Sequence, residues 1–79
     1  MNKLAGLFLN GSLGEVRVHV TELKGRDLVD IRVYSALKEG EAKIPTGKGL
    51  SLDVLHVKDL KDALTAAENI LRESRLINE

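Results

Sequence analysis

The chain lacks cysteine and tryptophan entirely, and it contains only one proline, one phenylalanine and one tyrosine. Without cysteine, a disulfide framework, a zinc site built from thiolates and a thiol nucleophile are all excluded. No apolar run approaches the roughly 20 residues of a membrane span, and no basic stretch leads into an apolar one as in a signal peptide. We therefore expect a cytosolic or nuclear protein with no membrane partner.

A net charge is also missing, because 12 Lys and Arg residues balance 12 Asp and Glu residues. Composition alone therefore does not indicate nucleic acid as a partner. The length of 79 residues predicts one domain, and a domain this small buries only about 60% of the surface that its unfolded chain exposes. With no disulfide to add stability, we expect further apolar burial through oligomerisation, as a homodimer.

A period of two over residues 16–34 predicts a β-hairpin. Valine alternates with polar residues from 16 to 21, as in a strand that buries one face. A polar turn with one glycine follows at 24–27, and the alternation resumes through 28–34. Because the β-branched residues of both strands share one face, the opposite face collects Arg17, His19, Thr21, Asp30, Arg32 and Tyr34.

Two shorter strands are predicted after the hairpin, at 42–44 and 48–52. Pro45, Thr46 and Gly47 separate them, in a combination typical of a turn. Together with the hairpin, these strands predict a sheet over residues 15–52.

The segment before the hairpin is interpreted as an N-terminal arm or an extra strand over residues 1–14. An apolar stretch at 7–9 runs into Asn10 and Gly11. This pair tolerates the positive φ angles of a tight hairpin turn, which favours a strand end before it.

From Asp53 the hydrophobic period changes to 3.6, which predicts one long helix over 53–75 and a short tail at 76–79. The apolar residues of this helix occupy an arc about 200° wide, whereas packing on one surface needs a stripe of roughly 100°. We therefore predict that the helix packs on its own sheet and also on a second copy of the chain. A helix lying deep in the cleft of a monomer is the alternative. The residues predicted at the dimer interface are Leu60, Ala63, Ala67, Ile70 and Leu71.

Basic residues on the polar face and its turns are the main candidates for binding. They are Arg17, Lys24, Arg26, Arg32, Lys43 and Lys48. A curved sheet with such a surface is suited to the phosphate backbone of a nucleic acid. The alternative is a charged strand face that contacts only solvent.

A glycine-flanked lysine at 46–49 invites comparison with a phosphate-binding loop. The segment lacks the first glycine and the Ser or Thr after the lysine that a nucleoside triphosphate site requires. It is suited to a single backbone phosphate, with a plain turn between strands as the alternative.

Catalytic and metal-binding groups do not converge in the sequence. His19 and His56 lie in different predicted elements, and nothing places either with the hydroxyl and carboxylate of a triad. His56 and Asp59 share a helix face, but two ligands do not make a zinc site, which needs three or four. We therefore predict no enzyme activity, no metal site and no cofactor.

Four motifs follow one another along the chain: a lysine-glycine-base turn, an Asp-Ile-Arg strand, a Glu-Gly-Glu turn and a Lys-Gly-aliphatic-Ser-Leu strand. They occur within the segments Glu22–Tyr34, Glu39–Lys43 and Gly47–Leu52. In this order they resemble the family of the transcriptional coactivator positive cofactor four, specifically its C-terminal single-stranded DNA-binding domain. The resemblance extends from about Val16 to about Leu64.

The resemblance implies an α+β fold: a curved four-stranded antiparallel sheet followed by one long C-terminal helix, forming a homodimer through the helices. The periodicities agree with this fold. The resemblance also implies that the sheets offer grooves to single-stranded or locally melted DNA. It assigns binding to Lys24, Gly25, Arg26, Arg32, Lys43, Lys48 and Gly49, to which the polar face adds Arg17 and Tyr34.

The chain departs from the family pattern at two aromatic positions, which here are Leu23 and Ser35. Base stacking, which contributes about 1–3 kcal/mol per base, is therefore unavailable at both. The loop at 44–47 is one residue longer and lacks an arginine beside the lysine. No serine-rich region precedes the domain, so the chain resembles the stand-alone members of bacteria and phages.

We therefore expect residues 15–75 to form a homodimeric, non-enzymatic single-stranded DNA-binding domain with little sequence preference, acting in transcription, replication, recombination or repair. The expected partners are single-stranded or melted DNA, a second copy, and replication or transcription proteins. The expected location is the cytoplasm or the nucleoid, or the nucleus of a eukaryotic source. The alternative is a small dimeric protein-interaction module without nucleic-acid binding, and duplex or RNA binding is a third hypothesis.

Overall fold

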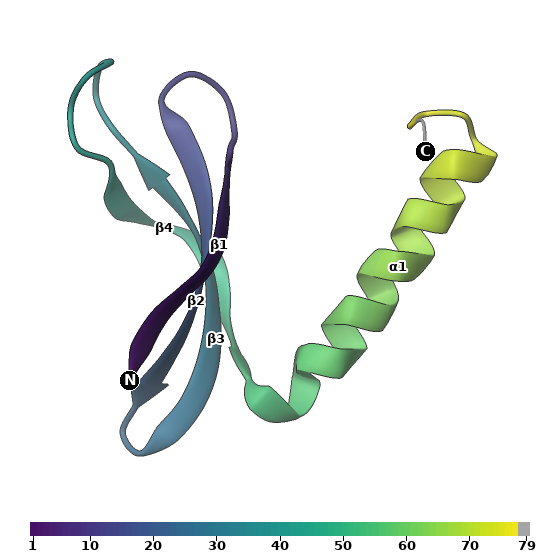
Figure 1. Ribbon diagram of the computed structural model, residues 1–79, viewed down its shortest axis with the longest axis horizontal. Coiled ribbons are helices and arrows are strands. Elements are labelled where there is room, and N and C mark those ends of the chain that lie inside the picture. Colours follow the sequence, from purple (N-terminus) through teal and green to yellow (C-terminus); the bar gives the residue numbers. More distant parts are fainter. Residues whose placement is uncertain (78–79) are drawn as a thin grey trace.

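The computed structural model describes residues 1–77 and contains one open sheet followed by one helix (Figure 1). All neighbouring strands are antiparallel, in the order β1-β2-β3-β4. The elements are β1 (Asn2–Leu9), β2 (Gly14–Leu23), β3 (Arg26–Ser35), β4 (Ile44–Asp53), the 3₁₀ turn η1 (Val54–His56) and α1 (Val57–Glu73). This confirms the predicted α+β class with four antiparallel strands and a C-terminal helix. Of the tail predicted at 76–79, residues 78–79 lie outside the described residues.

The hairpin between β2 and β3 is the most regular part of the sheet. Leu23 pairs with Arg26, so the loop has only two residues, Lys24 and Gly25. Both have positive φ angles, 52° and 78°. A right-twisted hairpin requires this geometry, which is free of strain at Gly25 but costs about 1 kcal/mol at Lys24.

The prediction of two short strands at 42–44 and 48–52 is wrong, because β4 is one strand. The pairing of β3 with β4 shifts register between Arg32 and Tyr34, and the extra residues of β4 form a bulge there. The Thr46 hydroxyl donates to the Val33 carbonyl at 2.8 Å and accepts from the Lys48 N–H at 3.1 Å. These two hydrogen bonds keep the strand continuous past Pro45, which an edge strand tolerates because one side of its backbone is unpaired.

The segment 1–14, interpreted from the sequence as an N-terminal arm or an extra strand, contains one strand in the structure. Residues 2–9 form β1, which pairs with β2 along its length. The turn between the two strands is closed by the Asn10 N–H, which donates to the Gly14 carbonyl at 3.0 Å. Gly11 has a φ of 79° in this turn, a conformation that a side chain disfavours.

The register separates the side chains of β2 and β3 into two faces, since directly opposed residues point to the same side. One face, here called the valine face, contains Val16, Val18, Val20, Val29, Ile31 and Val33, extended by Leu50 and Leu52 of β4. The other, here called the polar face, contains Glu15, Arg17, His19, Thr21, Asp30, Arg32 and Tyr34. The predicted division of the hairpin into two faces is confirmed.

The helical segment has a defined start and end. The Asp53 carboxylate accepts the Leu55 N–H at 3.0 Å and so caps η1, from which α1 continues. At the other end Arg75 has a φ of 58°, which breaks the helical path. The helix therefore stops at Glu73, close to the predicted end at residue 75.

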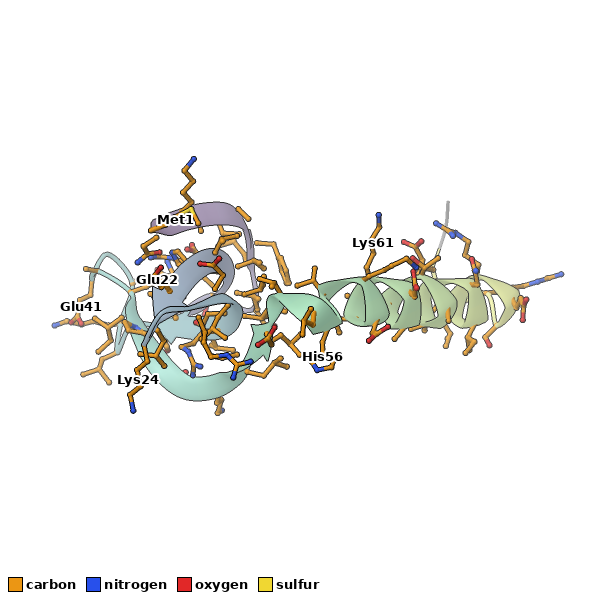
Figure 2. All side chains as sticks on the ribbon, turned by 90° about the horizontal axis from the view of Figure 1, so that it is seen from below. Met1, Glu22, Lys24, Glu41, His56 and Lys61 are labelled. Carbon is orange, nitrogen blue, oxygen red and sulfur yellow. The ribbon has the colours of Figure 1, made fainter. Side chains whose placement is uncertain are left out.

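The prediction that α1 packs on its own sheet is wrong. In Figure 1, α1 leaves the end of β4 and forms the second arm of a V, with the sheet as the first arm. In Figure 2, Lys61 on α1 lies well beyond the sheet. The alternative of a helix buried in a cleft of the monomer is equally wrong. A groove remains between the arms, lined by Val18, Val29 and Ile31 of the sheet and by Leu60 and Leu64 of the helix.

The single chain consequently has no closed core, and among residues 1–77 no apolar side chain is buried. Its radius of gyration is 14.8 Å, compared with roughly 12 Å for a compact chain of this length. Its accessible surface is 6301 Å², about 1,600 Å² more than a compact monomer of this size exposes. In the described part of the chain no helix is long and apolar enough to span a bilayer.

Candidate nucleic-acid interface

The centre of the polar face is an aromatic and charged cluster on β2 and β3. Arg17 Nε donates to Glu15 Oε1 at 2.6 Å, and the Arg17 guanidinium lies 4.2 Å from the centroid of the Tyr34 ring. The His19 ring is 5.9 Å from the same ring on a tilted plane. Glu15 is the one described side chain that is both charged and buried. The Arg17 guanidinium is therefore held over the Tyr34 ring by an ion pair and a cation–π contact.

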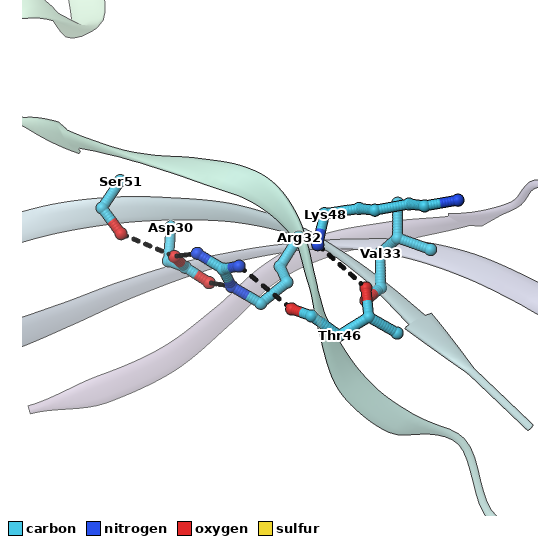
Figure 3. A network of polar contacts seen from close by, with 6 residues as sticks. All are labelled: Asp30, Arg32, Val33, Thr46, Lys48 and Ser51. Carbon is cyan, nitrogen blue, oxygen red and sulfur yellow. Dashed lines mark hydrogen bonds and ion pairs between the residues drawn. The ribbon is translucent and has the colours of Figure 1, made fainter.

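Arg32 lies directly opposite Arg17 and forms the second cluster of the polar face (Figure 3). Its Nε and Nη2 donate to the two oxygens of Asp30, at 3.1 and 2.9 Å, and its Nη1 donates to the Thr46 carbonyl at 3.0 Å. Ser51 adds a hydrogen bond from its hydroxyl to Asp30 at 2.7 Å. Arg32 thus links β3 to the bulge of β4, in addition to carrying a positive charge.

These contacts shift the ionisation of the pair. The hydrogen bond from Arg32 is the main reason why the pKa of Asp30 lies below its ordinary value of 3.8. Burial raises the same pKa and is the next largest effect, and the hydrogen bond from Ser51, which lowers the pKa, is smaller. In return, Asp30 raises the pKa of Arg32. Both groups are therefore charged at neutral pH, and each largely neutralises the other.

Gly49 allows β4 to approach this cluster. It pairs with Arg32 and has a φ of 150°, which side chains disfavour. A Cβ atom at this position would lie 2.8 Å from the Arg32 Cα and would also overlap the Ile31 carbonyl oxygen. A residue other than glycine would push β4 away from β3.

The β2–β3 turn carries Lys24, Gly25 and Arg26 at one end of the sheet. Arg26 forms an ion pair with Asp53, at the point where β4 passes into η1. The backbone N–H of Leu55, followed by Arg26, lowers the pKa of Asp53. Lys24 extends outward from the turn into solvent (Figure 2).

Three predicted lysines form no ion pair within the part of the chain that the structure describes: Lys24, Lys43 and Lys48. Lys24 lies at the turn, Lys48 lies in the β4 bulge beside Arg32, and Lys43 precedes β4 at the far end. In Figure 3 the Lys48 side chain extends away from the Arg32 guanidinium. The turn and the far end are separated by the length of β3, about 30 Å at 3.3 Å per residue. The predicted basic residues therefore follow the length of the sheet, and the arrangement is elongated.

Sequence reasoning missed the acidic partners of the arginines. Glu15 precedes Arg17 by two positions, and Asp30 precedes Arg32 by two. In a strand, residues two apart lie on the same face, so an acid-x-arginine pattern within a period of two could have indicated these pairs. The bulge that brings Thr46 to Arg32 has no comparable signal.

The residues predicted at the dimer interface lie along α1 and lack cover from the sheet. Ile70 is 61% exposed, and Ala63, Ala67 and Leu71 are also exposed, whereas Leu60 is half-buried near the start of the helix. Leu64, on the same side, is 60% exposed. The helix therefore presents an unpartnered apolar stripe.

The fold and the polar sheet face define a class: small α+β proteins with an open antiparallel sheet and one C-terminal helix. A sequence profile of the family described as Transcriptional Coactivator p15 (PC4), the positive cofactor four family, matches residues 12–63. Because this match spans more than half of the chain, the protein belongs to that family, as the sequence resemblance indicates.

Solved structures support the fold. A crystal structure of BPSL1147, a PC4 homolog from Burkholderia pseudomallei K96243, is similar with a TM-score of 0.75 and 20% identity, covering 86% of this chain and 98% of that chain. The bacteriophage T5 homolog of the eukaryotic coactivator PC4, described as implicated in recombination-dependent DNA replication, has a TM-score of 0.61 and 23% identity, covering 95% of this chain and 82% of that chain.

Proposed function

We propose that the protein is a homodimer that binds single-stranded or locally melted DNA with little sequence preference. The observation that carries the proposal is the elongated series of cations on and beside the polar face, in a chain that belongs to the PC4 family. A flexible strand with exposed bases suits a long, shallow, positively charged sheet surface. No part of this role requires a catalytic group.

Dimerisation is supported by the missing core. If two copies each bury the excess surface of about 1,600 Å², the interface covers about 3,200 Å², within the 2,000–5,000 Å² or so of obligate homodimers. We propose that the apolar stripe of α1 and the valine face supply this interface. The residues of the stripe are Leu60, Ala63, Ala67, Ile70 and Leu71, and residues 15–75 then act as one binding domain.

DNA contacts are proposed to divide between two kinds of basic side chain. The lysines at positions 24, 43 and 48, together with Arg26 at the turn, contact phosphates. Arg17 and Arg32, whose charges are balanced by acids, offer guanidinium planes on which bases stack, with Tyr34 beneath Arg17. Gly25 and Gly49 set the backbone geometry of the turn and of the β3–β4 approach.

The process served is proposed from the relatives. The family is described as one of transcriptional coactivators, and the T5 homolog is implicated in recombination-dependent DNA replication. We therefore propose a role in transcription, replication or recombination, with proteins of those processes as further partners. A location at the nucleoid, or in the nucleus of a eukaryote, follows from the proposed DNA binding.

The proposal is tested by fluorescence anisotropy of a labelled single strand of about 20 nucleotides, a length that exceeds one typical sheet-type binding site. Titration at low and at physiological salt should show saturable binding that weakens as salt rises. Unlabelled duplex should compete poorly, and strands of different sequence should bind similarly. Absence of binding at low salt would overturn the proposal and favour a module that binds proteins.

A further inference from the structure

The edge strand β1 places leucine side chains on the polar face. The register pairs Leu4 with His19, Leu7 with Arg17 and Leu9 with Glu15, so all three leucines share the side of these polar residues. Their exposed fractions are 50%, 49% and 71%. The three residues, here called the leucine row, form the apolar border of a charged surface.

A β-bulge produces this alignment. The pairing moves from Leu4 opposite His19 to Gly6 opposite Val18, so Ala5 is an extra residue in β1. Without the extra residue, Leu4 and Leu7 would point to opposite sides, because they are three positions apart. Bulges commonly redirect side chains in this way, and here the result is an unbroken leucine row.

We propose that the leucine row contacts the bases of bound single-stranded DNA, in place of the aromatic residues absent at Leu23 and Ser35. This inference rests on the proposed function and deepens it by assigning the base-contacting edge. Leu7 lies opposite Arg17, whose guanidinium covers Tyr34, so an apolar side chain and a guanidinium plane lie side by side. A nucleotide needs both, because its base has an apolar face and its phosphate is anionic.

The position of the row argues for DNA over a second copy of the chain. The surface that lacks a partner for dimerisation is the valine face with α1, on the other side of the sheet. A contact that covers the valine face leaves the leucine row uncovered. The row also adjoins the arginine clusters, so it is continuous with the proposed nucleic-acid surface.

The first test replaces the row by polar residues. In a variant with Leu4→Gln, Leu7→Gln and Leu9→Gln, the affinity for single strands should fall at least about fivefold, the loss expected when contact with one base is removed. The slope of affinity against salt should stay unchanged, since no cation is removed. The matched control is Leu55→Gln, at a residue that is 78% exposed but lies in η1, outside the sheet. Circular dichroism would check that the variant is folded, and light scattering would check that the mass of its oligomer in solution equals that of the wild type.

The second test adds a reporter at the same site. The chain contains no tryptophan, so Leu7→Trp introduces a single tryptophan, which can be excited selectively at about 295 nm and which bases quench on contact. We expect quenching by single strands, tighter binding than wild type, and little quenching by an abasic strand of equal length.

The outcomes separate the two proposals. Failure of the wild-type protein to bind single strands would overturn the proposed function, and this inference with it. Normal wild-type binding with an unaffected triple variant, or without quenching in the Leu7→Trp variant, would overturn only the inference. A triple variant whose oligomer has a lower mass by light scattering, with unaltered affinity for single strands, would also overturn the inference. That result would identify a second copy of the chain as the occupant of the leucine row.

Discussion

The valine face and the polar face lie on opposite sides of the same strands, yet they differ in how far one chain supplies their contacts, since both arginines of the polar face find their partners within it. These two arginines each have an acid at hydrogen-bond distance and a second partner, the Tyr34 ring for Arg17 and the Thr46 carbonyl for Arg32. The valine face has an open groove, beyond which α1 projects without cover. Polar contacts are satisfied locally in this fold, whereas the apolar side chains of the valine face and of α1 lack cover within the described part of one chain.

We therefore expect the two faces to have different roles. A second copy would complete the valine face and fix the orientation of two sheets, while the polar faces remain accessible to DNA. Stability and binding should then depend largely on different residues, with Arg32 as the exception because it also holds the β4 bulge. Three substitutions and a change of pH test that separation.

Placing a charge in the apolar stripe of α1 should have the largest effect. Ala67→Glu would bury an unpaired carboxylate in the proposed dimer interface, which costs about 3–5 kcal/mol. We expect a monomeric or unfolded protein by light scattering and circular dichroism. Asn69→Glu, on the opposite side of the helix, is the control and should remain dimeric. A dimeric, folded Ala67→Glu variant would remove α1 from the interface.

Removing Arg32 should affect both stability and binding, because this residue holds the β4 bulge as well as carrying charge. Arg32→Ala leaves the Thr46 carbonyl without this donor and Asp30 with only the Ser51 hydroxyl, and we expect a loss of about 1–3 kcal/mol in urea unfolding. Single-strand affinity should fall in the same variant. Unchanged stability would show that Arg32 acts in binding alone and does not hold the β4 bulge.

Removing Lys48 should weaken binding and leave stability unchanged, since the lysine forms no ion pair within residues 1–77. For Lys48→Ala we expect lower affinity for every single-stranded sequence and a salt slope reduced by roughly 0.7. Lys61→Ala on α1 serves as the matched control and should bind normally. Equal affinity in both variants would exclude Lys48 from the site.

Acid should produce the smallest effect, through Asp30. Its folded-state pKa lies below the ordinary value of 3.8, so its stabilising contribution is complete well above that value. The contribution of the ionised carboxylate to the free energy of unfolding is lost as the pH falls below 3.8 and through the folded-state pKa of Asp30. In urea unfolding at several pH values, Asp30→Asn should be less stable at neutral pH and should flatten the acid dependence. An unchanged acid dependence would show that the Asp30–Arg32 pair does not contribute to it.

Much of the fold was predictable from the sequence, because strict alternation in β2 and β3 and the later change of period leave few alternatives. The continuity of β4 was not predictable, since it depends on the Thr46 hydroxyl replacing ladder hydrogen bonds beside Pro45. The position of α1 was mispredicted for a physical reason: an apolar arc indicates that a helix needs partners without indicating which chain supplies them. The basic residues were identified, but their acidic partners and the leucine row depend on register.

Lysine footprinting tests the central claim most directly. The protein is acetylated with and without a saturating single strand, and protection at each lysine is measured by mass spectrometry. The account predicts protection of Lys24, Lys43 and Lys48, which follow the sheet, and none at Lys58 and Lys61 on α1. Protection of the α1 lysines with free reaction of the sheet lysines would contradict it.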